Sequence, residues 1–243
     1  MKEKIEEILK NGCEEMGLDL SEKQTDQFFR YYESLVEKNK VMNLTAITEA
    51  EDVARKHFLD SLLLYKAMPE MTAGEKTCID VGTGAGFPGI PLKIMFPELK
   101  MTLMDSLNKR VNFLNEVIRD LGLTGISAIH GRAEDLGHNG EYREKFDFCV
   151  SRAVANLATL SEYCLPFVKQ NGMFVSYKSG KIDEELEQAA GAIKKLGGSS
   201  DQVIFANIPG TDVERSFVFI KKVDKTAKKY PRKAGTPGKE PLR

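Results

Sequence analysis

The sequence contains no tryptophan, only three histidines and only four cysteines among 243 residues. The cysteines are far apart and form no C-x-x-C pair, which excludes the dense disulfide framework of a small secreted domain. We expect reduced thiols that serve as small apolar side chains. Because the histidines are also scattered, the Cys and His residues show none of the short spacings typical of zinc ligands, and no metal site is expected. The four cysteines are Cys13, Cys78, Cys149 and Cys164.

Long apolar runs are also absent, since none approaches the ~20 residues that a membrane-spanning helix needs. The N-terminus alternates charged residues with Ile5, Ile8 and Leu9, and it has neither the apolar segment nor the cleavage site of a secretion signal. We therefore expect a cytoplasmic protein with no membrane contact. The length and the 42% hydrophobic content suffice for one large α/β domain with a modest extension.

The formal charge of −1 conceals a basic C-terminus. Residues 221–243 contain nine Lys or Arg and two Asp or Glu. Pro and Gly are frequent there, so we expect no helix, and Tyr230 and Leu242 are possible anchors. The segment is either a solvated, frayed terminus or an arm that neutralises nucleic-acid phosphates, and its composition leaves both open.

The chain divides into three parts: an N-terminal helical extension (1–70), an α/β domain (71–223) and the basic tail (224–243). In the extension, apolar residues follow helical spacing, Ser21 to Gln24 has the form of a capping box, and a third helix is expected over Ala50–Ala67.

After Gly74, short β-rich runs alternate with helical stretches, which predicts a mostly parallel, doubly wound sheet. The last two strands are separated only by a short Pro-Gly connection, so we expect an antiparallel hairpin at one edge. The predicted strands are Thr77–Val81, Met101–Asp105, Ile126–His130, Phe146–Ser151, Met173–Lys178, Val203–Asn207 and Ser216–Lys221.

A glycine-rich loop, Gly82 to Gly89, comes after the first predicted strand and precedes a helix. This unit lets a nucleotide approach the backbone closely at the carboxyl edge of the sheet. Gly84, Gly86 and Gly89 fit the G-x-G-x-x-G pattern of dinucleotide enzymes. However, the glycines begin earlier, at Gly82, and Asp80 at the strand end needs a partner. A cationic ligand is one such partner, and S-adenosylmethionine carries an ammonium and a sulfonium.

Two further acidic residues support a nucleoside site. Asp105 ends the second strand 19 residues after Gly86, near the ~20 expected for a carboxylate that binds ribose hydroxyls. The alternative is that Asp105 caps the next helix. The third strand leads into Ala133 and Glu134, which are candidates for adenine packing and hydrogen bonding.

The segment after the fourth strand limits the identity of the methyl acceptor. Ser151-Arg-Ala-Val154 stands where enzymes that methylate exocyclic base amines often have an Asn/Asp-Pro-Pro-aromatic loop. Cys149 and Cys164 are expected in the core, which disfavours pyrimidine C5 methylation by a nucleophilic cysteine. An acceptor with a free lone pair, such as guanine N7, requires no general base. Cations would then hold the base and its phosphates, and Arg152, Arg132, Lys178 and Arg110 are candidates.

In combination, these motifs resemble bacterial small-subunit ribosomal RNA methyltransferase G, also called the glucose-inhibited division protein B family. The resemblance extends from about Asn43 to Leu242, and Phe87 stands where many members have leucine. The segments that carry it are Asn43–Ile47, His57–Ser61, Asp80–Leu92, Asp105–Arg110, Gly131–Glu134, Ser151–Val154 and Pro231–Leu242.

The resemblance implies a seven-stranded, Rossmann-like class I fold, S-adenosyl-L-methionine as donor, and methylation of guanine N7 in 16S ribosomal RNA, free or in the small-subunit particle. We expect a monomer in which Arg152 and Lys178 position the substrate. A nicotinamide-dependent oxidoreductase and a non-catalytic RNA-binding module are the alternatives. His57 and Asp60 are candidates for contact with substrate or donor, but a pair with this spacing on an apolar helix more often ties the helix to the core, which is what we expect. The expected donor-binding positions are Gly82, Gly84, Gly86, Phe87, Asp105, Ala133, Glu134 and Arg152.

Overall fold

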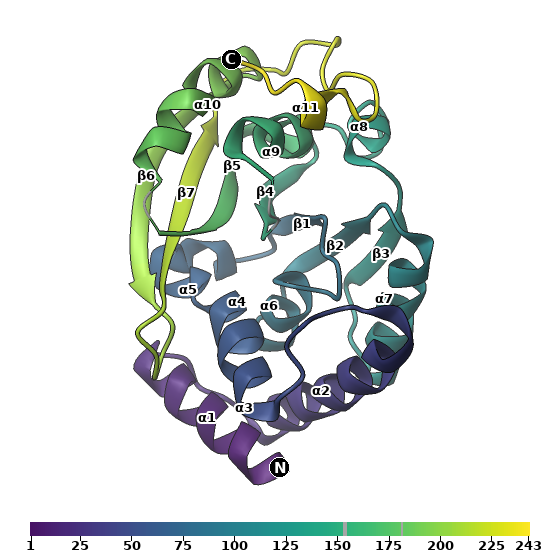
Figure 1. Ribbon diagram of the computed structural model, residues 1–243, viewed down its shortest axis with the longest axis vertical. Coiled ribbons are helices and arrows are strands. Elements are labelled where there is room, and N and C mark those ends of the chain that lie inside the picture. Colours follow the sequence, from purple (N-terminus) through teal and green to yellow (C-terminus); the bar gives the residue numbers. More distant parts are fainter. Residues whose placement is uncertain (153–154, 181) are drawn as a thin grey trace.

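A computed structural model describes residues 1–152, 155–180 and 182–243 of the chain. Its centre is a seven-stranded sheet in the order β3-β2-β1-β4-β5-β7-β6 (Figure 1). The predicted α/β architecture is confirmed. The strands are β1 (Thr77–Val81), β2 (Lys100–Asp105), β3 (Ile126–His130), β4 (Phe146–Ser151), β5 (Val168–Ser179), β6 (Gly198–Asn207) and β7 (Glu214–Lys222).

Strands β1 to β5 pair in parallel, whereas β7 lies antiparallel between β5 and β6. The predicted terminal hairpin is therefore confirmed, with β7 as its inner strand. Because parallel strands share a direction, β1 to β5 all end at the same edge of the sheet. That edge is where ligands bind in open α/β sheets.

Helices cover both faces of the sheet, because alternate side chains of each strand point to opposite sides. In β7, Phe217 and Phe219 belong to one buried cluster and Val218 and Ile220 to the other. The first cluster includes side chains of α6 (Gly89–Met95) and α7 (Asn108–Asp120), and the second those of α9 (Leu157–Cys164) and α10 (Asp183–Lys195).

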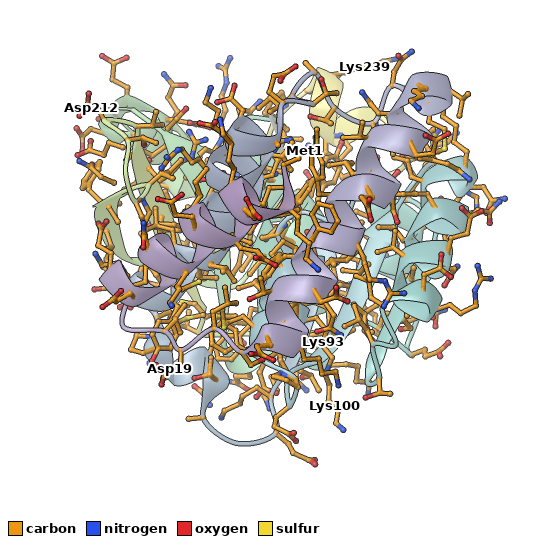
Figure 2. The ribbon with its side chains drawn as sticks, turned by 90° about the horizontal axis from the view of Figure 1, so that it is seen from below. Met1, Asp19, Lys93, Lys100, Asp212 and Lys239 are labelled. Atoms are coloured by element: carbon orange, nitrogen blue, oxygen red, sulfur yellow. The ribbon has the colours of Figure 1, made fainter. Side chains whose placement is uncertain are left out.

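The N-terminal helices α1 (Lys2–Glu15) and α2 (Glu22–Met42) pack onto the first of these faces. The predicted capping box is present, since Ser21 accepts a hydrogen bond from the Gln24 backbone and the Gln24 side chain accepts one from Ser21. Phe28 and Leu35 are fully buried in the same cluster as sheet residues, so this extension is a layer of the domain. Figure 2 views that side, with Met1 and Asp19 labelled at either end of the α1 segment.

The third predicted helix, Ala50–Ala67, is irregular where a regular helix was expected. It consists of α3 (Ala50–Val53), a π-helical stretch (Ala54–Leu59), α4 (Asp60–Leu62) and α5 (Leu64–Ala67). A π-turn shifts the side chains beyond it around the helix axis, and such turns are frequent at functional sites. Here the π-turn contains His57 and immediately precedes Asp60.

The C-terminal tail is packed on the domain and is not a frayed end. It runs beside α8 (Ala133–Leu136) and α9 (Figure 1), and the side chain of Tyr230 is buried in the second cluster. The expectation of no helix is wrong for one turn, α11 (Thr236–Lys239), which comes after Gly235 and has Pro237 in its first turn, where proline is tolerated. No helix in the described ranges is long and apolar enough to span a bilayer.

Candidate functional site

The glycine loop leaves β1 at the carboxyl edge of the sheet and leads into α6. Gly82 and Gly84 have φ of 73° and 62°, a region that glycine enters without steric cost. A Cβ added at either would meet no atom within 4 Å, so the backbone here faces open space. Gly86 differs, because a Cβ there would meet Ile90 and the Tyr31 hydroxyl. Gly82 and Gly84 can therefore cradle a ligand, and Gly86 faces the protein.

Asp80 is fully buried beneath this loop. Its Oδ2 accepts hydrogen bonds from the Thr83 hydroxyl at 2.6 Å and from the Gly89 backbone at 2.9 Å. Burial raises the pKa of this carboxyl to about 7, although these two hydrogen bonds act in the opposite direction. Asp80 thus finds its partners within the loop and holds the turn in place. Its Oδ1 has no hydrogen-bond partner among the described residues.

Asp105 braces the same loop from the end of β2. Its Oδ2 accepts the Gly84 N–H at 2.9 Å and lies 3.4 Å from Arg110 Nη1, while Oδ1 accepts the Leu107 N–H at 2.9 Å. The side chain is buried, yet it lines a cavity. Helix α7 begins at Asn108 with Leu107 as its N-cap residue, so Asp105 is not a helix cap.

A first cavity of about 400 Å³ lies between the glycine loop and α8, and we call it the donor cavity. Four predicted donor-binding residues line it together: Gly82, Asp105, Ala133 and Glu134. Other lining residues were not predicted as donor contacts, and Gly235 comes from the tail. They include Ser106, Arg110, Leu160, Tyr163 and Gly235.

Phe87 and Arg152 lie outside the lining of the donor cavity, on the side of α4. The Arg152 guanidinium carbon lies 5.0 Å from the centre of the Phe87 ring. The ring of His57 stacks on the Phe87 ring at a centroid distance of 4.5 Å. The predicted donor-binding positions are therefore divided between two regions of the sheet edge.

Asp60 organises the second region. Its Oδ2 accepts a hydrogen bond from Arg152 Nη1 at 2.6 Å, and its Oδ1 accepts one from Arg215 Nε at 2.6 Å. Two guanidiniums therefore share this carboxylate. Because the Asp60 side chain is only 1% exposed, it has almost no contact with water. Asp60 therefore ties its helix to the sheet, as expected, and one of its two partners is the predicted site residue Arg152. Arg215, from β7, was not anticipated.

His57 is buried next to these arginines. Its Nε2 lies 2.8 Å from Thr45 Oγ1, and its Nδ1 lies 3.3 Å from Arg152 Nη2. Burial, together with the positive charge of Arg152, lowers the pKa of His57 from 6.5 to about 4. The ring is therefore neutral at pH 7. Thr45 links it to the Asn43–Ile47 segment, since its hydroxyl accepts the Ile47 N–H at 3.0 Å.

A second cavity of about 570 Å³ opens over the ends of β4 and β5, and we call it the cationic cavity. Lys178, a predicted substrate-positioning residue, is part of its lining and is already paired: its Nζ lies 2.6 Å from Glu185 Oε1 and donates to the Ala155 carbonyl at 2.8 Å. Four basic side chains face two carboxylates in this lining, so the cavity favours anions. The charged residues are Lys56, Arg152, Lys178 and Arg215 with Asp60 and Glu185.

Several other predictions concern the surroundings of the two cavities. Cys149 and Cys164 are fully buried, which agrees with a core role. Of the segment Ser151–Val154, residues 153 and 154 lie outside the described residues. In the described part of the chain no group of three or more His, Cys, Asp or Glu side chains could hold a metal ion.

Comparison with known proteins places this site in a family. The family model of GidB, rRNA small subunit methyltransferase G, matches residues 24–217. The chain is 55% identical to ribosomal RNA small subunit methyltransferase G of Lachnoclostridium phytofermentans over 231 residues, covering 95% of each chain. It is also 55% identical to that of Desulforamulus reducens, covering 96% of this chain and 97% of the relative.

Solved structures support the fold. The structure of M. jannaschii TYW2 in complex with AdoMet aligns with a TM-score of 0.51 and 17% identity, covering 67% of this chain and 75% of that one. This distant likeness concerns the architecture alone, whereas the sequence relatives match nearly from end to end. The chain belongs to the GidB family, the rRNA small subunit methyltransferase G family.

Proposed function

We propose that the protein transfers a methyl group from S-adenosyl-L-methionine to N7 of a guanine in 16S ribosomal RNA. The observation that carries this proposal is the pair of cavities at one edge of the sheet. One is lined by a glycine loop and two acidic residues, and the other by four basic side chains. A nucleoside donor fits the first, and a nucleotide of RNA fits the second.

The donor cavity has the features that an adenosine moiety needs. Gly82 leaves its backbone open for close approach. The Asp105 carboxylate uses part of its accepting capacity on backbone N–H groups and retains lone pairs for ribose hydroxyls. Ala133 and Glu134 begin α8, shortly after β3, where they would pack against the adenine and accept from its amino group.

The methionine end of the donor would then point along Gly84 toward Phe87 and Arg152. Phe87 is buried and supplies apolar contact, while Arg152 is fixed by Asp60. Asp80 Oδ1, which has no hydrogen-bond partner in the described part of the chain, would lie beneath this path and favour a positively charged ligand. Gly86 supports the loop from the protein side.

The acceptor needs positioning more than proton transfer. The guanine N7 would approach the methyl carbon on the side opposite the sulfur. Its lone pair then forms the new C–N bond while the C–S bond breaks and the electron pair of that bond stays on sulfur. N7 carries no proton, so no general base is required, which fits a neutral, buried His57. Because N7 must stay free to attack, Arg152 and Lys178 would donate to guanine O6 and to phosphate oxygens.

Donor binding tests the first half of the proposal. Calorimetry with S-adenosylhomocysteine should show micromolar affinity that is lost in Asp105→Ala and retained in Asp135→Ala, an exposed acid beside the cavity. Equal affinity in both variants would reject the ribose assignment. If the unmodified chain binds NADH but not S-adenosylhomocysteine, it is an oxidoreductase. If it binds RNA but neither of these ligands, it is an RNA-binding module.

Methyl transfer tests the second half. Lys178→Ala should lower the rate of RNA methylation about 100-fold while leaving donor affinity unchanged. Lys169→Ala is the matched control, because Lys169 lies at the other end of β5, paired with Asp147. Mass mapping of 16S ribosomal RNA from cells with and without the protein should show one 7-methylguanosine that depends on it. If 16S ribosomal RNA from both kinds of cell lacked this 7-methylguanosine, the proposed substrate would be refuted.

The partner is either free 16S ribosomal RNA or the small-subunit particle, and we propose that the protein acts on it as a cytoplasmic monomer. Few large apolar side chains are exposed among the described residues, and they come from separate parts of the sequence. Sedimentation at micromolar concentration tests the monomer, and a dimer that persists on dilution would contradict it.

A further inference from the structure

The tail returns from β7 across the second face of the sheet and is anchored by buried polar groups. Lys222 is fully buried, and its Nζ donates to the Leu165 carbonyl at 2.7 Å and to Thr226 Oγ1 at 2.8 Å. The Arg143 guanidinium donates to the carbonyls of Thr226 and Tyr230 at 2.6 and 2.9 Å. These contacts fix the tail before it reaches the donor cavity.

The Arg232–Glu162 ion pair holds the next part of the tail. Glu162 is fully buried on α9, and its two carboxylate oxygens accept from Arg232 Nε and Nη2 at 3.0 and 2.7 Å. The Arg232 backbone N–H also donates to Glu162 at 2.7 Å. The same guanidinium donates to the Glu240 carbonyl at 2.7 Å, so it ties both ends of residues 232–240 to one point. Bidentate pairs of this kind fix geometry as well as charge.

Gly235 lies in the middle of this tied segment and lines the donor cavity. Its φ of 82° suits glycine, and its N–H donates to Glu134 Oε1 at 2.9 Å. Just beyond it, Thr159 Oγ1 donates to the Pro237 carbonyl at 2.9 Å. The orientation of the Glu134 carboxylate is therefore set by the tail, 101 residues away in sequence.

We propose that residues 230–240 hold Gly235 as part of the wall of the donor cavity and that Arg232 is a positioning residue for donor binding. This inference rests on the proposed placement of the donor. The lysines of the same segment, Lys233 and Lys239, are exposed, whereas the contact with Glu134 is made by the Gly235 backbone. Because the wall and the donor share Glu134, donor binding and the order of the tail are coupled, and each strengthens the other.

Two neighbouring substitutions separate this role from the loss of charge. Arg232→Ala and Lys233→Ala each remove one positive charge, but only the first breaks the pair with Glu162. In calorimetry, Arg232→Ala should weaken the affinity for S-adenosylhomocysteine about tenfold, and Lys233→Ala should leave it within about twofold. In turnover, Arg232→Ala should raise KM for the donor and leave kcat at saturation unchanged, and Arg232→Lys should recover part of the affinity.

Hydrogen exchange on the unmodified chain tests the coupling even if Arg232→Ala fails to fold. Saturating S-adenosylhomocysteine should slow amide exchange in residues 230–240. If the unmodified chain binds S-adenosylhomocysteine but exchange in the tail is unchanged and both variants bind equally, the tail is only a structural support and this inference is overturned. If the unmodified chain does not bind S-adenosylhomocysteine at all, the proposed donor is wrong instead.

Discussion

Replacing Asp60 by alanine should destabilise the fold strongly, because two guanidiniums depend on this one carboxylate. The side chains of Arg152 and Arg215 are 17% and 23% exposed, so neither can hydrate fully when Asp60 is removed. Breaking a buried ion pair by removing one partner costs about 3–5 kcal/mol. Since both arginines retain some contact with water, we expect a loss near the lower end, about 3 kcal/mol of unfolding free energy.

Asp52→Ala is the matched control on the same helical segment. Asp52 pairs with Lys56 at 2.9 Å, but these side chains are 45% and 40% exposed. Exposed pairs separated by four residues on a helix contribute only about 0.3–0.5 kcal/mol, so this substitution should cost about 0.5 kcal/mol. Asp60→Asn, which keeps the volume and one acceptor oxygen, should fall between the two.

Urea unfolding monitored by circular dichroism at pH 7 and 25 °C measures all three variants. The dependence of the unfolding free energy on urea should keep its slope, because the buried area changes little. If Asp60→Ala costs no more than Asp52→Ala, then the desolvation of this carboxylate offsets its two ion pairs. The view that Asp60 fixes Arg152 would then be refuted.

Three further predictions concern single residues. The pKa of His57 is lowered from 6.5 to about 4, so between these values the unfolded chain binds a proton that the folded chain does not, and stability falls as the pH falls. The difference in unfolding free energy between the unmodified chain and His57→Gln should therefore shrink by about 2 kcal/mol from pH 7 to pH 5, and a constant difference would contradict the neutral ring. Gly89→Ala places a Cβ against Leu103 and 2.9 Å from Asp80 Oδ2, so thermal unfolding should show a loss of about 1–3 kcal/mol. Gly140→Ala, which meets no atom within 4 Å, should be nearly neutral in the same assay, and equal losses would argue against the tight turn. Gly82→Ala and Gly17→Ala, at φ of 73° and 72°, should cost similar stability, about 1 kcal/mol, but only Gly82→Ala should weaken S-adenosylhomocysteine binding in calorimetry. Unchanged donor affinity in Gly82→Ala would place the ligand elsewhere.

Elements with a strong local signal were predicted well. The bounds of β1, β3 and β4 agree with the prediction, because each is a short β-rich run bounded by turn residues or a helix. Strand β5 is longer than expected, since its first half includes polar residues such as Lys169 and Gln170 and lacks an apolar pattern. The glycine loop and Asp105 were located correctly because their spacing is local to one strand–loop–helix unit.

The parts that could not be predicted depend on contacts between distant residues. The π-turn at His57 has no sequence signal, and Asp60 finds its second partner, Arg215, 155 residues away. Asp80 was expected to need a partner, for which a cationic ligand was one candidate, and Thr83 and Gly89 satisfy one of its oxygens from within the loop. The contact of Gly235 with Glu134 arises only after the tail has folded across α9, and a composition rich in Pro, Gly and Lys gives no indication of it.

The sharing of Asp60 by two arginines bears on the charge that the cationic cavity presents. Arg152 and Arg215 each bond to one oxygen of the same buried carboxylate, so two guanidiniums are held in defined orientations while only one negative charge is placed between them. The cluster therefore keeps a net positive charge, and its guanidiniums are already ordered before any anion arrives. An anionic ligand that binds beside such a preordered pair loses less side-chain entropy than one that must first immobilise two free arginines.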